Sequence, residues 1–176
     1  MKRAADGDDA AFEDLVDRCQ AGLIQFFTVL SRNRADGEDL AQEAFIRLYR
    51  ARRAYRAQAR FRTYLYRIAQ NLWTDYLRRK KTRIGESPLD DRNRQGPPEP
   101  GSASANREPT VSVKTRKELY NAVLALSEEQ RMVLLLNLVE DLTYPQIAET
   151  LSIPVGTAKS RMHHALRKLQ ALLKSR

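Results

Sequence analysis

The chain has 176 residues, of which 30% are charged and 42% hydrophobic, so it allows one domain or two small ones. No apolar run reaches the length of a membrane helix, and the acidic N-terminus lacks the apolar core of a secretory signal. Cys19 has no second cysteine to pair with, and with only His163 and His164 beside it a four-ligand Cys/His zinc site is excluded. These features predict a cytoplasmic protein without metal or cofactor.

Positive charge is concentrated in two segments of an otherwise acidic chain. Residues 50–83 hold 12 basic side chains and one acidic one, and residues 154–176 hold six basic side chains and no acidic one. Solvated helix faces are the plain alternative, but a long segment with a single acid is unusual for such a face. The two segments therefore predict binding to a nucleic acid.

A first helical unit is predicted over residues 1–83. Its first helix carries apolar residues at spacings of three and four: Phe12, Leu15, Val16, Cys19, Leu23, Phe26 and Leu30. Cys19 is expected to be a small core side chain. Asp36 is predicted to cap a second helix that ends near Arg53, and a third helix has the same apolar periodicity from Phe61 to Tyr76.

Residues 84–113 hold five of the seven prolines and predict a flexible linker. Residues 114–176 predict a second helical unit, in which Ser127–Gln130 and Thr143–Gln146 have the pattern of capping boxes. No alternating strand pattern occurs. The predicted fold class is therefore all-α, with two small helical domains joined by a linker.

The last two predicted helices, residues 143–151 and 154–172, have the spacing of a helix-turn-helix. The second is expected to turn inward Val155, Ala158, Met162, Leu166 and Leu169, and to expose Gly156, Lys159, Ser160, His163, His164 and Arg167. Such a helix fits the major groove of DNA. An ordinary helical hairpin is the alternative, but the absence of acidic residues favours DNA.

Six of the 13 aromatic residues lie in the basic segment 50–83. Unpaired bases stack on aromatic faces while arginines follow the phosphates, so this pattern is typical of a surface for unpaired DNA or RNA. Phe61 and Tyr76 lie on the apolar stripe and are expected in the core. Tyr55, Arg56 and Trp73 are the preferred candidates for contact with bases.

An acidic strip, Asp39-Leu-Ala-Gln-Glu43, places Asp39 and Glu43 on one helix face. It is expected to avoid DNA and could dock a basic protein partner. On spacing alone, a solvated face is the favoured interpretation.

Two sets of motifs stand out along the chain. The first unit contains DGEDLAQEAFIRLY at 36–49, FRTYLYRIAQN at 61–71 and DYLR at 75–78. The second unit contains LSEEQR at 126–131, LTYPQIAE at 142–149 and PVGTAKSR at 154–161. The first set resembles the N-terminal domain, and the second set the C-terminal domain, of the extracytoplasmic-function (ECF) sigma factors of bacterial RNA polymerase. The likeness covers nearly everything except the linker.

The resemblance implies an initiation factor that binds core polymerase, recognises the −35 and −10 promoter elements, helps to open the duplex and catalyses no covalent reaction. It implies these roles: Asp39, Leu40, Gln42 and Glu43 contact the β′ clamp helices; Tyr55, Arg56, Arg60, Phe61, Arg62, Asn71 and Arg78 contact the −10 element; Thr157, Lys159, Arg161 and Arg167 with Ser160, His163 and His164 contact the −35 element. The polymerase β flap is a further implied partner, and family members are commonly held by an anti-sigma factor.

The sequence departs from the family pattern at four positions. Tyr64 replaces the usual Trp, and Gln58 and Ala59 replace acidic or glycine residues of the −10 loop. His164 stands where Arg is frequent, which removes a bidentate arginine–guanine contact. These changes leave the preferred promoter sequence open.

Two other functions compete with this interpretation. A helix-turn-helix regulator that acts without polymerase is the runner-up, although no dimerisation helix is evident. A nucleic-acid-processing enzyme is disfavoured because the sequence offers no clustered metal ligands, no P-loop and no nucleophile–base pair.

Overall fold

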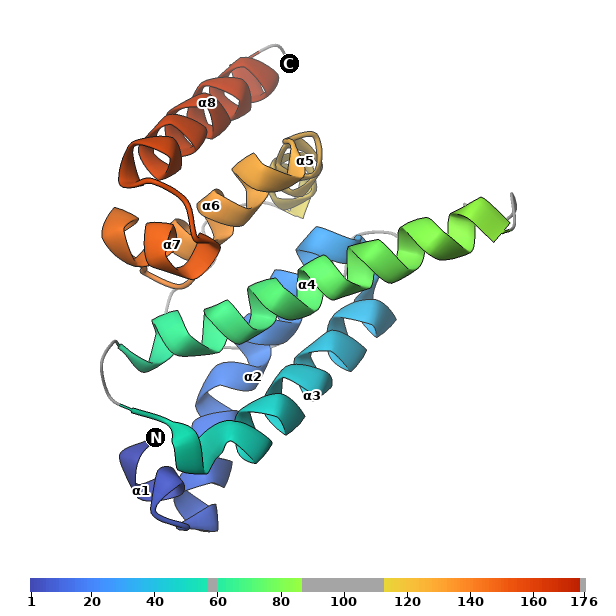
Figure 1. The fold of residues 1–176 in the computed structure, drawn as a ribbon. Helices are drawn as coiled ribbons and strands as arrows, with labels where there is room; N and C mark the ends of the chain where they lie inside the picture. The colour runs from blue at the N-terminus through green and yellow to red at the C-terminus, as the bar shows by residue number, and fades with distance from the viewer. Residues whose placement is uncertain (57–59, 87–112, 175–176) are drawn as a thin grey trace. The chain divides into compact units, whose positions relative to one another are not determined.

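The computed structural model describes residues 1–56, 60–86 and 113–174, and every regular element among them is a helix. The elements are α1 (Lys2–Ala5), α2 (Asp9–Ser31), α3 (Arg34–Ala51), the short 3₁₀ helix η1 (Arg52–Ala54), α4 (Phe61–Glu86), α5 (Val113–Leu124), α6 (Glu128–Leu138), α7 (Tyr144–Leu151) and α8 (Val155–Lys174) (Figure 1). The all-α prediction is confirmed for this part of the chain. The predicted linker lies outside the described residues except at its two ends, which belong to α4 and α5.

The chain divides into two compact units. Helices α1 to α4 with η1 form the first, and α5, α6 and α8 with most of α7 belong to the second. No helix in the described ranges is long and apolar enough to cross a membrane.

The core of the first unit lies where α3 packs against α2 on one side and α4 on the other. Leu23, Phe27, Leu48 and Leu72 are completely buried there. Phe26 of α2 also meets Tyr66 of α4 edge to face, with 5.1 Å between ring centroids. Cys19 is only half-buried, so it borders this core and does not fill it.

The start of α3 differs from the prediction. Asn33, and not Asp36, is the N-cap: its side-chain oxygen accepts a hydrogen bond from the Asp36 N–H at 3.2 Å. α2 ends at Arg32 in the left-handed conformation, with φ 61°, so α3 begins after a turn of two residues. The Asp36 carboxylate instead accepts a hydrogen bond from the Tyr76 hydroxyl of α4 at 2.7 Å.

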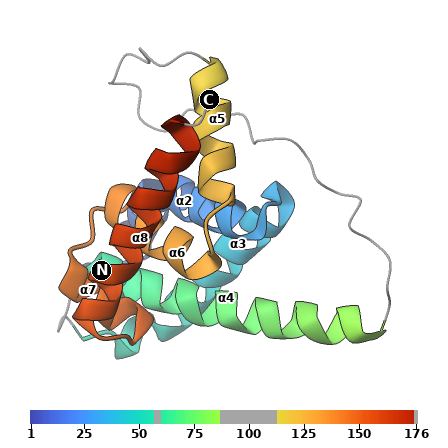
Figure 2. The same ribbon diagram turned by 90° about the horizontal axis from the view of Figure 1, so that it is seen from above.

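The second unit is built around α6, which packs against α8 (Figure 2). The Ser127 capping box at the start of α6 is confirmed in both its hydrogen bonds. At the start of α7, Gln146 accepts hydrogen bonds from the N–H and the hydroxyl of Thr143, at 2.8 and 2.9 Å. Arg131 is 4% exposed and donates to the carbonyls of Val123, Leu124 and Leu126, which fastens the end of α5 to α6.

The inward stripe of α8 is shifted from the predicted one. Ala158, Met162, Ala165 and Leu169 are buried, whereas Val155 and Leu166 are 38% and 41% exposed. The buried residues follow one another at spacings of four, three and four, and two of them are alanines. Ala165 is completely buried, and the adjacent Leu166 lies outside the buried face.

Candidate nucleic-acid and protein interfaces

The outer face of α8 is exposed as predicted. Gly156, Lys159, Ser160, His163, His164 and Arg167 are all exposed. The rings of His163 and His164 meet edge to face with 5.9 Å between their centroids. Because α8 carries no acidic residue, this face presents cations and hydrogen-bond donors without a competing carboxylate on the same helix.

Arg161 lies differently from its neighbours on α8. Its guanidinium forms an ion pair with Glu129 at the start of α6, with 3.1 Å between nitrogen and oxygen. The side chain of Arg161 is 26% exposed and that of Glu129 is 66% exposed. Arg161 must therefore leave Glu129, or share it, in order to bind a phosphate. Thr157, the other half-buried member of the predicted −35 set, lies in the first turn of α8.

The basic and aromatic segment places Tyr55 directly after η1. The Tyr55 ring is half-buried and meets the Tyr64 ring edge to face at 5.1 Å. Burial, and then the neighbouring Tyr64, raise the pKa of the Tyr55 hydroxyl, so this group stays neutral and presents an uncharged aromatic surface. Arg56 and Arg60, which both follow Tyr55 in the chain, are exposed. Gln58 and Ala59 lie outside the described residues.

The outer face of α4 carries the other predicted −10 residues. Asn71 and Arg78 are exposed and seven residues apart, so they share one side of the helix. Arg67, which is not among the predicted −10 residues, is exposed four residues before Asn71 on the same side. Arg62 is also exposed, and Phe61 is half-buried at the first position of α4.

The prediction that Trp73 contacts bases is wrong. Trp73 is 3% exposed, and its ring stacks on Tyr76 at 5.2 Å with an interplanar angle of 21°. α4 packs against both α2 and α3, so its buried face is wider than a single stripe and includes Leu72 and Trp73 together.

The acidic strip is only partly available. Asp39 and Gln42 are exposed, but Leu40 is 6% exposed and its side chain lies in the core, which corrects its assignment as a contact residue. Glu43 accepts a hydrogen bond from Arg47 at 2.9 Å, and Arg47 also reaches Asp75 of α4 at 3.4 Å. Glu43, with Asp75 adding to its effect, raises the pKa of Arg47.

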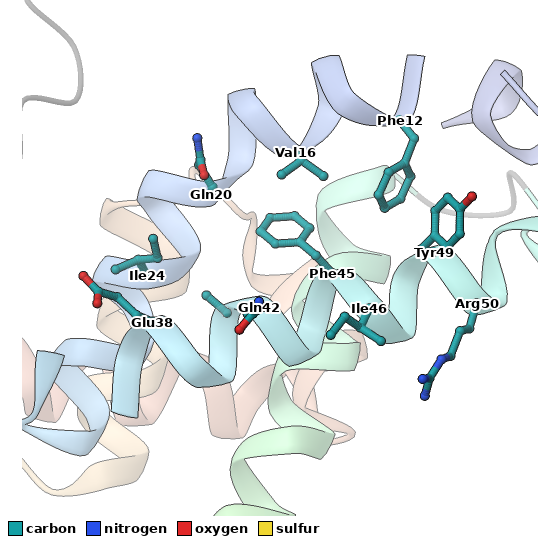
Figure 3. A pocket seen from close by; sticks show the side chains of 11 residues that line it. Phe12, Val16, Gln20, Ile24, Glu38, Gln42, Phe45, Ile46, Tyr49 and Arg50 are labelled. Atoms are coloured by element: carbon teal, nitrogen blue, oxygen red, sulfur yellow. The ribbon is translucent and has the colours of Figure 1, made fainter. Parts of the chain in front are cut away.

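A groove between α2 and α3 was not predicted from the sequence. It has a volume of about 430 Å³. Its lining residues are Phe12, Val16, Gln20 and Ile24 of α2, and Glu38, Ala41, Gln42, Phe45, Ile46, Tyr49 and Arg50 of α3 (Figure 3). The signal that could have found it is the apolar pair Phe45 and Ile46, which lies beside the core stripe of α3. Gln42 belongs both to this groove and to the acidic strip.

Two family models match the chain in order. Residues 15–83 match sigma-70 region 2, which spans most of α2 to α4, and residues 116–169 match sigma-70 region 4, which spans most of α5 to α8.

Two relatives match over almost the whole chain. The ECF RNA polymerase sigma factor SigW of Bacillus subtilis (strain 168) is 34% identical, over 96% of this chain and 93% of its own. The ECF RNA polymerase sigma-E factor of Escherichia coli (strain K12) is 32% identical, over 94% of this chain and 87% of its own.

Two solved structures share the fold. The sigma factor RpoE, in complex with the anti-sigma factor NepR from Bartonella quintana, matches with a TM-score of 0.75 at 21% identity, covering 93% of this chain and 97% of that one. CnrH, in complex with the cytosolic domain of CnrY, matches with a TM-score of 0.68 at 24% identity, covering 98% and 94%. Both family regions, in order, and relatives above 30% identity along nearly the whole chain show that this protein belongs to the ECF sigma factors.

Proposed function

We propose that the chain directs core RNA polymerase to −35 and −10 promoter elements and promotes opening of the duplex. The observation that carries this proposal is the presence, in one chain of this family, of two separate exposed basic faces, one on α4 and one on α8. In the part of the chain that the structure describes, no group of three or more His, Cys, Asp or Glu side chains could hold a metal ion. Binding and strand separation, without covalent chemistry, are what such faces can perform.

The residues divide into three working surfaces in this proposal. Asp39, Gln42 and Glu43 of α3 meet the β′ clamp helices of the polymerase. Tyr55, Arg56, Arg60, Phe61, Arg62, Asn71 and Arg78 hold the −10 element, with Tyr55 stacking on an extruded base. The −35 element is bound by Thr157, Lys159, Ser160, Arg161, His163, His164 and Arg167.

The domain boundaries follow the same division. Residues 1–83 carry the polymerase and −10 surfaces, residues 114–176 carry the −35 surface, and residues 84–113 connect them. The protein acts in the cytoplasm, where core polymerase and promoter DNA are its partners and the β flap meets the second unit. The structural neighbour RpoE, whose structure was solved with the anti-sigma factor NepR, supports an anti-sigma factor as a further partner.

Reconstituted transcription tests the proposal. Core polymerase from the source bacterium is incubated with a library of its genomic fragments, with and without the chain, and the 5′ ends of the transcripts are sequenced. We expect new start sites that share one −35 and −10 pair and that require the chain. A chain that yields no promoter-specific transcript but binds a palindromic duplex by itself would be the polymerase-independent regulator instead.

A further inference from the structure

Arg52 lies at the point where α3 passes into η1, and it contacts two other parts of the first unit. Its guanidinium carbon lies 3.5 Å from the centroid of the Tyr49 ring, and its Nη1 donates to the Tyr49 carbonyl at 3.0 Å. Its Nη2 lies 3.5 Å from Oδ1 of Asp9 at the start of α2, and the Tyr49 hydroxyl donates to the same oxygen at 3.3 Å. Arg52 thus connects the last turn of α3 with the beginning of α2.

Arg52 is the inward-facing member of a group of arginines. Its side chain is 15% exposed, whereas Arg50, Arg53 and Arg56 are all exposed. The charge pattern of the segment does not distinguish these four residues. The structure does, because α1 packs against η1 and Phe12 of α2 packs edge to face on Tyr49 at 5.0 Å.

The position of Arg52 determines where the −10 loop begins. η1 is a single 3₁₀ turn, which has little stability of its own. It ends at Tyr55, whose N–H donates to the Arg52 carbonyl at 3.2 Å and whose backbone is extended, with φ −62° and ψ 129°. The Tyr55 ring then packs on Tyr64 of α4. Any shift of Arg52 is passed to Tyr55 through this short turn.

We propose that Arg52 is a positioning residue: by holding η1 against Tyr49 and Asp9, it presents Tyr55 for capture of an unpaired −10 base, without itself touching DNA. This inference rests on the proposed function. The stacked guanidinium and its bond to the Tyr49 carbonyl are the stronger contacts, since the pair with the mainly exposed Asp9 is long and screened by water. A lysine cannot stack on the ring and bond the carbonyl in this flat geometry.

The test uses holoenzyme assembled from core polymerase and the full chain. The probes are two fluorescein-labelled single strands: the non-template −10 strand of a promoter found by the library experiment, and its complement. Arg52→Met removes the stacked guanidinium, and Arg53→Met removes the same charge from the exposed neighbour in the same turn. We expect Arg53→Met to lower the affinity for both probes by a similar factor and so to keep the preference for the non-template strand. Arg52→Met should reduce that preference about tenfold, as the loss of one stacked base would.

Two further measurements separate positioning from a general structural effect. The Arg52→Met variant should bind core polymerase with the affinity of the wild type. The double variant with Tyr55→Ala should show nearly the same strand preference as Arg52→Met alone, because Tyr55 is already displaced in that background. Asp9→Asn, a milder change at the same contact, should move the strand preference in the same direction by a smaller factor.

The possible outcomes distinguish the inference from the function on which it rests. If wild-type holoenzyme binds both strands equally, the proposed −10 role itself fails. If wild type prefers the non-template strand and Arg52→Met keeps that preference, Arg52 does not position Tyr55. Should Arg52→Met fail to fold, an unchanged preference in both Asp9→Asn and Arg52→Lys overturns the inference. Equal losses of core affinity and strand preference would reduce Arg52 to a structural role.

Discussion

Gly37 of α3 lies directly against the backbone of Thr28 in α2. A Cβ placed on Gly37 would lie 2.8 Å from the Thr28 nitrogen and 2.9 Å from its Cα, and closer still to the Thr28 hydroxyl. Both residues are buried, and the Thr28 hydroxyl has no hydrogen-bond partner. Because backbone atoms cannot move aside as a flexible side chain can, glycine at this position is what permits α2 and α3 to pack so closely.

Gly37→Ala should therefore destabilise the first unit by about 1–3 kcal/mol, because the added methyl forces the two helices apart. Trp73, the single tryptophan, is buried in this unit, so its fluorescence during urea unfolding measures the change. Gly156→Ala on α8 is the matched control: a Cβ there has no atom within 4 Å, and this fluorescence transition should not move. An unchanged unfolding midpoint for Gly37→Ala would contradict the close packing.

Ser152→Gly should have the opposite effect and raise the free energy of unfolding. Ser152 lies in the turn between α7 and α8 with φ 53°, a conformation that disfavours residues with a Cβ. Glycine adopts it without strain, so we expect the variant to gain about 0.5–1 kcal/mol. Thermal unfolding followed by circular dichroism at 222 nm measures this.

The control for Ser152→Gly is the same substitution at Ser160, an exposed position within α8. There the backbone is helical, and replacing serine with glycine should destabilise by about 0.5 kcal/mol. Equal effects at the two positions would mean that the left-handed backbone at Ser152 carries no strain.

The long helices and the order of the two units could be predicted from the sequence, because most of these helices have a clear apolar period and five of the seven prolines lie together in the linker. The first residue of each helix and the face that it buries depend on tertiary contacts, which the sequence pattern does not show. Asn33 and Asp36 are both good capping residues, and the choice between them followed from where α2 ends. Leu166 fits the period of α8, but the neighbouring Ala165 takes the buried position.

The sequence predicts the site residues only where the spacing of apolar residues along a helix shows which side chains are exposed. The exposed residues of α8 follow directly from it. The burial of Leu40 and Trp73 and the inward position of Arg52 depend instead on which helices pack together. The ion pair between Arg161 and Glu129 also could not be predicted from the spacing of residues, because the two residues lie far apart in the sequence.

Asp8 makes the stability of the first unit depend on pH. Its carboxylate accepts a hydrogen bond from the Ala11 N–H and pairs with Arg3; the first of these contacts, then the second, lowers the pKa of Asp8 from its ordinary value of 3.8. Because the pKa of Asp8 is lower in the folded protein than in the unfolded chain, its charge stabilises the fold at any pH above the pKa of the unfolded chain. This contribution is lost as the pH falls through the pKa of the folded protein. Asn caps a helix as well as Asp, so Asp8→Asn removes mainly the charge.

We therefore expect wild type to resist urea better than Asp8→Asn at pH 7, and the difference to shrink as pH falls below about 4. Unfolding midpoints from Trp73 fluorescence at pH 7, 5, 4 and 3 give the comparison. A difference that stays constant down to pH 3 would show that the Asp8 charge does not stabilise the fold.

Asp39→Arg tests the polymerase surface. Asp39 is exposed on α3 and outside the core, so the fold should survive while the reversed charge repels a basic partner surface. We expect at least about a tenfold loss of affinity for core polymerase, measured by competition against labelled wild type. Asp17→Arg, an equally exposed reversal on α2, should change the affinity much less. Equal effects of the two substitutions would point to net charge and not to a specific surface.

Glu129→Gln should strengthen binding of the −35 element, because Glu129 pairs with Arg161 and so competes with the DNA phosphates for its guanidinium. A surface ion pair of this kind contributes about 0.2–1 kcal/mol, so releasing Arg161 should raise the affinity of the full chain for a labelled −35 duplex up to about fivefold. The gain should decrease with added salt, since both the pair and the phosphate contact are screened. Glu149→Gln on α7 removes the same charge from another exposed position and measures the general electrostatic effect. Fluorescence anisotropy with each substitution, alone and in an Arg161→Met background, completes the cycle. If Glu129→Gln gives the same gain without the Arg161 guanidinium, the carboxylate acts on DNA directly and Arg161 is not the residue that it restrains.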